Sequence, residues 1–504
     1  MKHLHDALDK IINKYQDNSY ISNRLETYIL QILPTALENS CINYEKRTEK
    51  KEEMIQHRKS FVERFMNKNK NYYCPVNKLF LQYDGIHFLG HGEDDIQHNI
   101  LSTITHEGNL TSLKYKINNE VIRTIKSRSP LDVIPESFTI QHTINMLIPY
   151  FFNSKYGAKY FLTILGDNIL GNGNKNNVYI ISASAKEIIQ EIGHLWNMHF
   201  GQNNIVQNIK YKYYGHDYNN CRLLNINTEY TSTYKNLANN ISKYIIDLLC
   251  VATHYSRRHK TSDNYLEHCT DTAFVEHVRY LTDKTSSEIV DSFIDICIDK
   301  CNGSKMETRN LIFIWKKFLK EKNLPNIIFQ EPLKLLFKEK LAYCEQGDLF
   351  LNITSTSLPL VATFIDFWEQ TYQVDENEDE LEIDEICFLF KKWSNKSLSN
   401  ITDTFLIDLI RHYYPSIEID SNKYLLNSRN NLWDKRNDVI QHLEIYKLHT
   451  MDIQHIPTLS SAYEYYIQKQ NFGLYNYKVS KRYFEKIASE ELGDNLDSDG
   501  IIHK

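Results

Sequence analysis

The spacing of hydrophobic residues predicts helices along most of the chain. In residues 4–70, apolar side chains recur every three or four positions and form two stripes, separated by the charged run 44–54. The stripes consist of Leu25, Ile29, Ile32 and Leu33, and of Phe61, Phe65 and Met66. We therefore predict a helical arm over residues 1–77, with a structural or docking role rather than a chemical one.

The pattern changes after the arm. Residues 78–89 contain two apolar stretches on either side of Asp84-Gly85, a dipeptide that tolerates the positive φ of a tight turn. This predicts a β-hairpin. Amphipathic helices are expected at 114–128 and 137–150, so that residues 78–150 form a hairpin with a helical domain.

Residues 160–192 have the layout of a nucleotide-binding P-loop: a helix, a polar loop, a buried strand at 178–181, and a short loop that opens a second helix. A working P-loop needs glycines to curl its backbone around phosphates. Here Ser182-Ala-Ser184-Ala-Lys186-Glu187 follows the strand, so Ser184 and Lys186 remain as candidate nucleotide contacts without glycines. The carboxylate of Glu187 would repel phosphate. The alternative is that Lys186 is an ordinary exposed residue in the first turn of a helix.

A second apolar strand follows near Arg222. In an active P-loop ATPase such a strand ends in acidic residues that hold magnesium. This one ends in Asn225 and Asn227, and Glu229 is displaced by two positions. Because amides are weaker metal ligands than carboxylates, we predict that no catalytic residues remain.

The middle of the chain is predicted to be helical, and it carries one basic cluster. The expected helices are 237–251, 273–281, 287–301 and 307–322. Arg257, Arg258 and Lys260 lie between two of them and are candidate nucleic-acid phosphate contacts. A solvated loop is the alternative interpretation of this cluster.

Neither cysteine nor histidine spacing predicts a metal or a cofactor. The nine cysteines form no paired framework and no C-x-x-C motif, so reduced thiols are expected. Cys297 and Cys301 are expected to pack in one apolar helix. His254, His259 and His268 match no standard ligand spacing.

Residues 346–450 have the outline of a winged helix-turn-helix. Helices are predicted at 358–372, 386–393 and 402–413, an acidic linker at 375–385, and two short strands near 417–427; a tail follows from 451 to 504. Such a module binds nucleic acid with its second helix, or serves as a protein-interaction module. The candidate phosphate contacts are Lys391, Lys392, Lys396 and Arg411.

Composition supports an α/β fold that is predominantly helical. The 504 residues are 42% hydrophobic and 24% charged, as in a globular protein of two to four domains, and only 16 glycines and 10 prolines disfavour a turn-rich β architecture. A net charge of −6 excludes a uniformly cationic surface, but local basic faces remain compatible with it. No apolar stretch reaches the length of a membrane helix, and we expect a cytoplasmic protein without a membrane partner.

The order of these parts resembles one family. The Tyr-Asp-Gly hairpin, the helix ending in Ile-Leu-Gly-Asp-Asn-Ile-Leu-Gly, the buried strand with its lysine loop, the Arg-Leu-Leu strand and the winged segment are similar to the helicase half of poxvirus-type primase-helicases. These are superfamily 3 helicases of large DNA viruses and some phages. The resemblance covers residues 78–445 and includes a degraded P-loop core at 151–345. It implies that Lys186 corresponds to the phosphate-binding lysine and Arg222 to the arginine before the acidic strand end.

The family forms hexameric rings that hydrolyse ATP and move along DNA beside a primase. Because the loop and the strand end depart from that pattern, we expect a catalytically inactive relative. It would bind DNA or RNA, or scaffold a viral DNA replication complex with other replication proteins, in the host cytoplasm or a viral factory. Two alternatives remain: an active ATPase in which Ser184, Lys186 and Glu229 converge on nucleotide, and an interaction protein that binds no nucleic acid.

Overall fold

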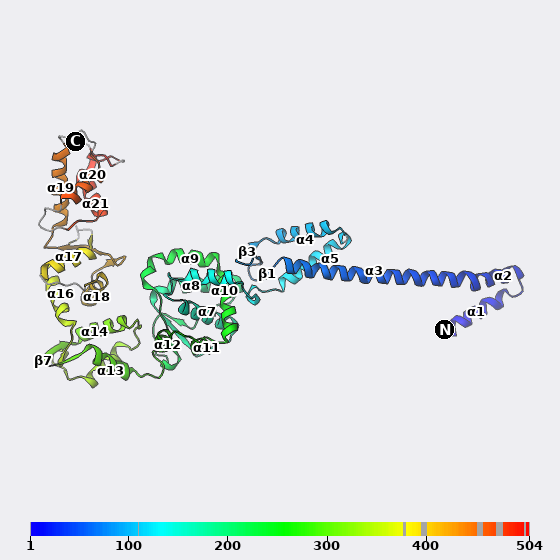
Figure 1. Cartoon of the computed structure of the whole chain (residues 1–504), viewed down its shortest axis with the longest axis horizontal. Helices are drawn as coiled ribbons and strands as arrows, with labels where there is room; N and C mark the ends of the chain where they lie inside the picture. The colour runs from blue at the N-terminus through cyan, green and yellow to red at the C-terminus, as the bar shows by residue number, and fades with distance from the viewer. Residues whose placement is uncertain are drawn as a thin grey trace. The chain divides into compact units, whose positions relative to one another are not determined.

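The computed structural model divides the chain into two compact units, residues 1–285 and 286–504 (Figure 1). It describes residues 2–108, 110–375, 380–394, 401–450, 457–469, 477–497 and 500–502. The fold is α/β and predominantly helical, with 64% helix and several small sheets, as the sequence predicts. None of the helices in these ranges combines the length and the apolar character that a membrane crossing requires.

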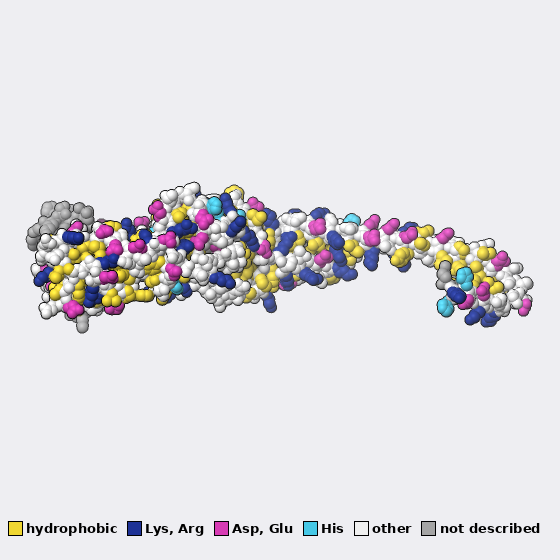
Figure 2. Space-filling model, turned by 90° about the horizontal axis from the view of Figure 1, so that it is seen from below, with side chains coloured by type: hydrophobic (Ala, Val, Ile, Leu, Met, Phe, Trp, Pro, Cys, Tyr) yellow, Lys and Arg dark blue, Asp and Glu magenta, His cyan; other side chains and the backbone are white. Residues whose placement is uncertain are grey.

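The arm is helical as expected, but only its end is buried. It consists of α1 (Lys2–Tyr15), α2 (Ser19–Thr27), a π-helical turn η1 (Tyr28–Ile32) and α3 (Leu33–Lys68). Among the described residues, none before Phe61 is buried, whereas Phe61, Phe65 and Met66 join a hydrophobic core. Along the remaining surface of the arm, basic, acidic and hydrophobic side chains are interspersed (Figure 2). The first predicted stripe is therefore left without a covering partner in unit 1.

The predicted hairpin is present, inside a three-stranded antiparallel sheet. Its strands are β1 (Asn71–Cys74), β2 (Leu79–Tyr83) and β3 (Phe88–His91), in the order β1-β2-β3. The connection between β2 and β3 has four residues. Gly85 has the expected positive φ, +99°, and the backbone N–H of Asp84 donates a 3.2 Å hydrogen bond to the carbonyl oxygen of His87 across the turn. The Asp84 carboxylate closes this loop by accepting hydrogen bonds from the backbone N–H groups of Ile86 and His87, both at 2.7 Å. Helices α4 (Glu93–Glu107) and α5 (Lys114–Lys126) follow.

A parallel sheet forms the centre of unit 1. Strands β4 (Val178–Ile181), β5 (Ile209–Lys210) and β6 (Cys221–Leu224) lie in the order β5-β4-β6. The helices of this region are α6 (Ser137–Leu147), α7 (Lys155–Leu170), α8 (Lys186–Phe200), α9 (Tyr234–Lys243), α10 (Ile245–His259), α11 (Ser262–Glu267) and α12 (Thr272–Val278). The single helix predicted at 237–251 is wrong, because the chain breaks at Tyr244 between α9 and α10.

Helices α7 and α10 approach each other closely at a glycine. A Cβ atom added to Gly166 would lie 2.1 Å from the carbonyl oxygen of Ala252 and 2.7 Å from the Cβ of Ser256. Ser256 in turn donates a hydrogen bond of 2.7 Å to the buried carboxylate of Asp167. Glycine at 166 therefore sets the distance between the two central helices of the unit.

Unit 2 begins with a small antiparallel sheet and three helices. Its elements are α13 (Ser286–Cys297), β7 (Asp299–Glu307), α14 (Thr308–Glu321), α15 (Gln330–Lys340), β8 (Tyr343–Cys344) and β9 (Leu349–Thr354). The helix predicted at 287–301 ends at Cys297, and Cys301 lies on β7, so the two cysteines do not share a helix. The reason is long-range pairing, because β7 pairs with β9 on both sides of a register shift, with Asp299 opposite Thr354 before it and Lys305 opposite Leu351 after it.

The helices and strands predicted in the last third are present, with additional strands. They are α16 (Leu358–Thr371), β10 (Tyr372–Val374), β11 (Glu380–Glu382), α17 (Ile383–Ser394), α18 (Asp403–Tyr413), β12 (Ile419–Asp420), β13 (Tyr424–Leu426) and β14 (Ser428–Asn430). Strands β11, β13 and β12 form an antiparallel sheet in that order, and β10 pairs with β14. Helices α19 (Lys435–Thr450), α20 (Leu459–Lys469) and α21 (Lys481–Leu492) complete the unit.

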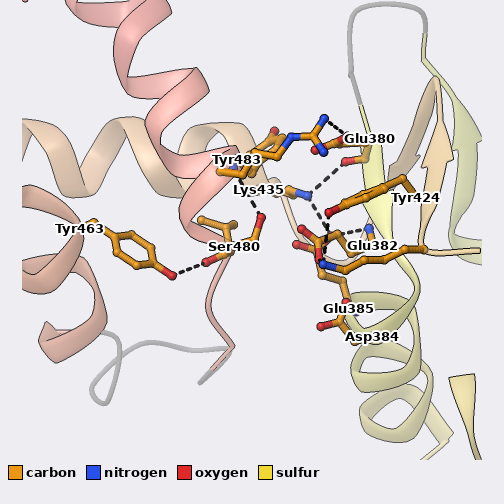
Figure 3. Close-up of polar contacts among 12 residues, drawn as sticks. Glu380, Glu382, Asp384, Glu385, Tyr424, Lys435, Tyr463, Ser480 and Tyr483 are labelled. Atoms are coloured by element: carbon orange, nitrogen blue, oxygen red, sulfur yellow. Dashed lines mark hydrogen bonds and ion pairs between the residues drawn. The ribbon is translucent and has the colours of Figure 1, made fainter. Parts of the chain in front are cut away.

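The acidic segment 375–385 is not a solvated linker throughout, contrary to the prediction. Glu380 and Glu382 lie on β11, and Glu382 and Glu385 are buried (Figure 3). The Lys435 ammonium lies 2.8 Å from the Glu385 carboxylate and 3.7 Å from the ring centre of Tyr483. Burial nevertheless raises the pKa of Glu385 to about 6. Lys435 on α19, Arg482 on α21 and Lys423 just before β13 each pair with one of these glutamates and thus allow acidic residues to enter the core.

Candidate nucleic-acid interface

The loop after β4 has no phosphate cradle. Residues Ala183–Ala185 form a single 3-10 turn, and the hydroxyl of Ser184 lies 3.0 Å from that of Ser182. Lys186 opens α8 and is exposed, as the simpler sequence interpretation expected. Because the loop is short and lacks glycine, its backbone N–H groups are not arranged to surround a phosphate.

Arg222 is occupied by internal contacts. Its guanidinium forms a two-point ion pair with Asp263, at 3.0 and 3.3 Å, and also donates to the carbonyl oxygens of Asn219 and Cys221. Burial opposes ionisation of Asp263, but hydrogen bonds from Arg222 and Asn177 lower the pKa of this carboxyl. The arginine therefore ties β6 to α11, and few of its N–H donors remain to bind a nucleotide.

The amide at the end of β6 is also structural. Asn227 accepts a hydrogen bond from the backbone N–H of Glu229 and donates one to the carbonyl oxygen of Pro149, at 3.1 and 3.0 Å. It caps the 3-10 turn η6 (Thr228–Thr233). Glu229 itself is exposed on that turn.

Of the three arginine and lysine residues at the end of α10, one holds a neighbouring turn in place and two are exposed. Arg257 donates 2.7 Å and 2.8 Å hydrogen bonds to the carbonyl oxygen of Leu131 and the carboxylate of Asp132, which fasten the 3-10 turn η3 (Pro130–Asp132). Arg258 and Lys260 are exposed. Only these two remain available for an external anion.

The basic residues predicted in unit 2 do not all gather in one place. Lys391 and Lys392 are exposed in the last turn of α17. Lys396 lies outside the described residues. Arg411 is on α18 and donates a 2.6 Å hydrogen bond to the side chain of Asn422, in the turn between β12 and β13. Of the four, Arg411 lines a groove.

That groove lies between α14 and α18, and we call it the α14–α18 groove. It contains two hollows, of about 180 and 770 Å³, that share Lys316, Lys320, Arg411 and His412 in their linings. Phe313 packs against the rings of Phe405, His412 and Tyr413 at its floor. Arg309 fixes the end of α18 by donating to the carbonyl oxygens of His412 and Tyr413.

Only part of the positive charge in the α14–α18 groove is neutralised. Lys320 pairs with Asp408, Lys334 with Asp348 at 3.0 Å, and Lys317 with Glu321 at 3.8 Å. Within the described ranges, the groove residues Arg309, Lys316 and Arg411 form no ion pair with a carboxylate. Three arginine or lysine side chains thus keep a net positive charge beside an aromatic floor.

His412 does not add to this charge at neutral pH. Burial, together with the nearby Lys316 and Arg309, lowers the pKa of His412 although a backbone contact opposes that effect. Its Nε2 lies 2.8 Å from the carbonyl oxygen of Arg309, and its Nδ1 lies 3.2 Å from the Lys316 ammonium. This arrangement fits a neutral ring that donates at Nε2 and accepts at Nδ1.

The sequence identified Arg411 but missed its partners on α14. Arg309, Phe313, Lys316 and Lys320 share one face of this helix, at intervals of three and four residues. That spacing was visible in the sequence. What was not visible is that the face lies along α18, 103 residues away for Arg309 and His412.

The comparisons with known proteins found no relative. No protein-family model matches the chain, and neither a curated protein nor a solved structure shows significant similarity to it.

Proposed function

We propose that this protein binds nucleic acid through the α14–α18 groove and does not hydrolyse ATP, as a helicase-like component of a viral DNA replication complex. The observation that carries the proposal is a hollowed groove with three cations, Arg309, Lys316 and Arg411, that have no carboxylate partner in the described part of the chain. Phosphate oxygens are the ligands that such lysine and arginine groups bind in nucleic-acid complexes.

The topology around α18 supports this assignment. Helix α16, strands β10 and β11, helices α17 and α18, and the β12–β13 hairpin follow one another, with β11 and β12 on either side of β13. This order supports a winged helix, in which α18 would be the recognition helix and the β12–β13 turn the wing. The hydrogen bond between Arg411 and Asn422 joins these two parts.

The negative part of the proposal rests on the core of unit 1. Phosphoryl transfer depends on positioned cations and metal ligands around the phosphates. Here the loop after β4 is a single tight turn, Arg222 is paired with Asp263, and Asn227 caps a helix. These contacts favour a structural role for the core and disfavour nucleotide hydrolysis.

The test is fluorescence anisotropy with labelled single-stranded and double-stranded DNA at two salt concentrations. The double variant Lys316→Gln/Arg411→Gln removes two groove charges. Its matched control, Lys300→Gln/Lys305→Gln, removes two exposed charges from β7 in the same unit. We expect the groove variant to bind at least about tenfold more weakly and with a shallower salt dependence, since each lost phosphate contact lowers the slope by about one. The control should bind like the wild type.

Equal loss in both variants would contradict the groove as the binding site. No binding by the wild-type protein at low salt would leave the interaction-protein alternative in its place. ATP turnover is followed in the same samples, and turnover that Lys186→Ala abolishes would establish the divergent-ATPase alternative instead.

A further inference from the structure

A cluster of two histidines and one aspartate lies in unit 1, away from the loop after β4 in the sequence. His87 comes from the loop between β2 and β3, His142 from α6, and Asp247 from the first turn of α10. One possible ligand atom from each residue lies within 4.8 Å of those of the other two. Tyr244, between α9 and α10, packs its ring 4.6 Å from both imidazoles.

The contacts within this cluster hold two of the three side chains in place. The Asp247 carboxylate is buried, lies 2.6 Å from His87 Nδ1, and accepts a 2.9 Å hydrogen bond from the backbone N–H of Phe88. His142 packs its ring against that of His87 at 4.5 Å, nearly perpendicular. The Nδ1 atom of His142 is buried and has no hydrogen-bond partner among the residues that the structure describes.

We propose that His87, His142 and Asp247 bind one divalent transition-metal ion of the zinc type. Two imidazoles and one carboxylate are a ligand set that Zn²⁺ and neighbouring first-row metals take in proteins. Bonds of about 2.0–2.2 Å in a tetrahedron place ligand atoms about 3.5 Å apart. The widest pair of the cluster therefore closes by no more than about 1.3 Å, and the 2.6 Å contact between His87 Nδ1 and the Asp247 carboxylate lengthens as the metal replaces the proton between them.

The metal would have an open coordination position. A cavity of about 620 Å³ adjoins the cluster and is lined by His142 and Tyr244 together with Asn145, Asn236 and Asn240. Closed structural zinc sites use four protein ligands, whereas three ligands beside a cavity leave a place for water or a small ligand. The assigned site is therefore of the open type, and the amides of the cavity are suited to hydrogen-bond whatever occupies it.

A purely structural role explains only part of this geometry. The hydrogen bonds from His87 and Phe88 to Asp247 tie the hairpin to α10 without any metal. They give no reason for a second histidine, whose buried nitrogen lacks a partner, to lie against the first. A metal ion would satisfy that nitrogen.

The experiment is a titration of the chelator-treated, full-length protein with Co²⁺, followed by visible absorption. Co²⁺ takes the place of Zn²⁺ in such sites and reports its coordination through d–d bands. We expect one Co²⁺ per chain with the bands of a low-coordinate site, and loss of the bands when Zn²⁺ is added. Zn²⁺ should also raise the melting temperature of the wild-type protein, because it binds the folded state.

His142→Ala is the decisive variant, since the structure gives its Nδ1 no hydrogen bond to lose. It should bind Co²⁺ at least tenfold more weakly and keep the circular dichroism of the wild type. His268→Ala, an exposed histidine elsewhere in the unit, is the control and should bind normally. Absence of the bands in the wild type, or equal binding by His142→Ala, would overturn the proposal. Neither result bears on DNA binding by the α14–α18 groove, so the two proposals are tested separately.

Discussion

Replacing Gly166 by alanine tests how closely α7 and α10 must approach. The added Cβ would lie 2.1 Å from the carbonyl oxygen of Ala252, although such atoms essentially never come closer than 3.0 Å. The two helices would have to separate by about 1 Å, and they hold the largest hydrophobic core of unit 1. Since the obstacle is a backbone oxygen, no rotamer change at residue 252 can remove it.

The expected cost is large for a single methyl group. Alanine is a better helix former than glycine by about 1 kcal/mol, which works in favour of the variant. Overpacking a rigid core costs about 1–3 kcal/mol, and more where backbone has to move. We therefore expect a net loss of about 2–4 kcal/mol from the free energy of unfolding of unit 1, a substantial share of the about 5–15 kcal/mol that such a unit has.

Hydrogen exchange with mass spectrometry in increasing urea is the suitable assay, because it reports the two units through separate peptides. Peptides from α7 and α10 should lose protection at lower urea in Gly166→Ala, whereas peptides from unit 2 should not change. Gly171→Ala is the comparison. Its φ of +71° is strained for alanine, but apart from its chain neighbours no described residue has an atom within 4 Å of the new Cβ, so it should cost only about 1–2 kcal/mol. An unchanged midpoint for Gly166→Ala, or a larger effect of Gly171→Ala, would refute the reasoning.

Two further predictions concern unit 2. Lys435→Met removes the cation beside the buried Glu385 and should lower the free energy of unfolding, measured by urea titration, by about 3–5 kcal/mol. Arg436→Met breaks an exposed ion pair and should cost no more than about 1 kcal/mol. Equal effects of the two variants would contradict the importance of burial. Hydrogen bonding to Asp438 raises the pKa of His442. A raised pKa stabilises the fold below the unfolded value of about 6.5, and this contribution disappears as pH rises through the folded value. The stability advantage of the wild type over His442→Gln should therefore be greater at about pH 5 than at about pH 8, and thermal melts at the two pH values will show whether it is.

Local patterns in the sequence were sufficient for most elements. The helices at 114–128, 307–322, 358–372 and 402–413 and the buried strand at 178–181 all lie where apolar periodicity placed them. Periodicity is a property of neighbouring residues, so these elements could be predicted without knowledge of their partners. Apolar periodicity failed where pairing between distant segments decides the conformation. Cys301 is the example, since it lies on β7, which pairs with β9.

Charge was the least predictable property. The acidic run at 375–385 has the composition of a linker, yet Glu382 and Glu385 are buried because Lys423 and Lys435 reach them from other segments. Conversely, Arg222 and Arg257 looked like candidate anion contacts, but each is paired with an aspartate, Asp263 and Asp132. The composition of a segment does not tell which partner neutralises it.

The sequence by itself determined the helical character of the chain, the hairpin, the buried strand at 178–181 and the absence of a glycine-rich phosphate loop, because these depend on spacing and residue type within short windows. Tertiary structure alone decided which side chains meet. It placed Lys316 beside Arg411 in a groove, and it brought His87, His142 and Asp247 together from positions 55 and 105 residues apart. Side chains so distant along the chain become neighbours only through the burial of hydrophobic surface between helices and sheets, which no local pattern records.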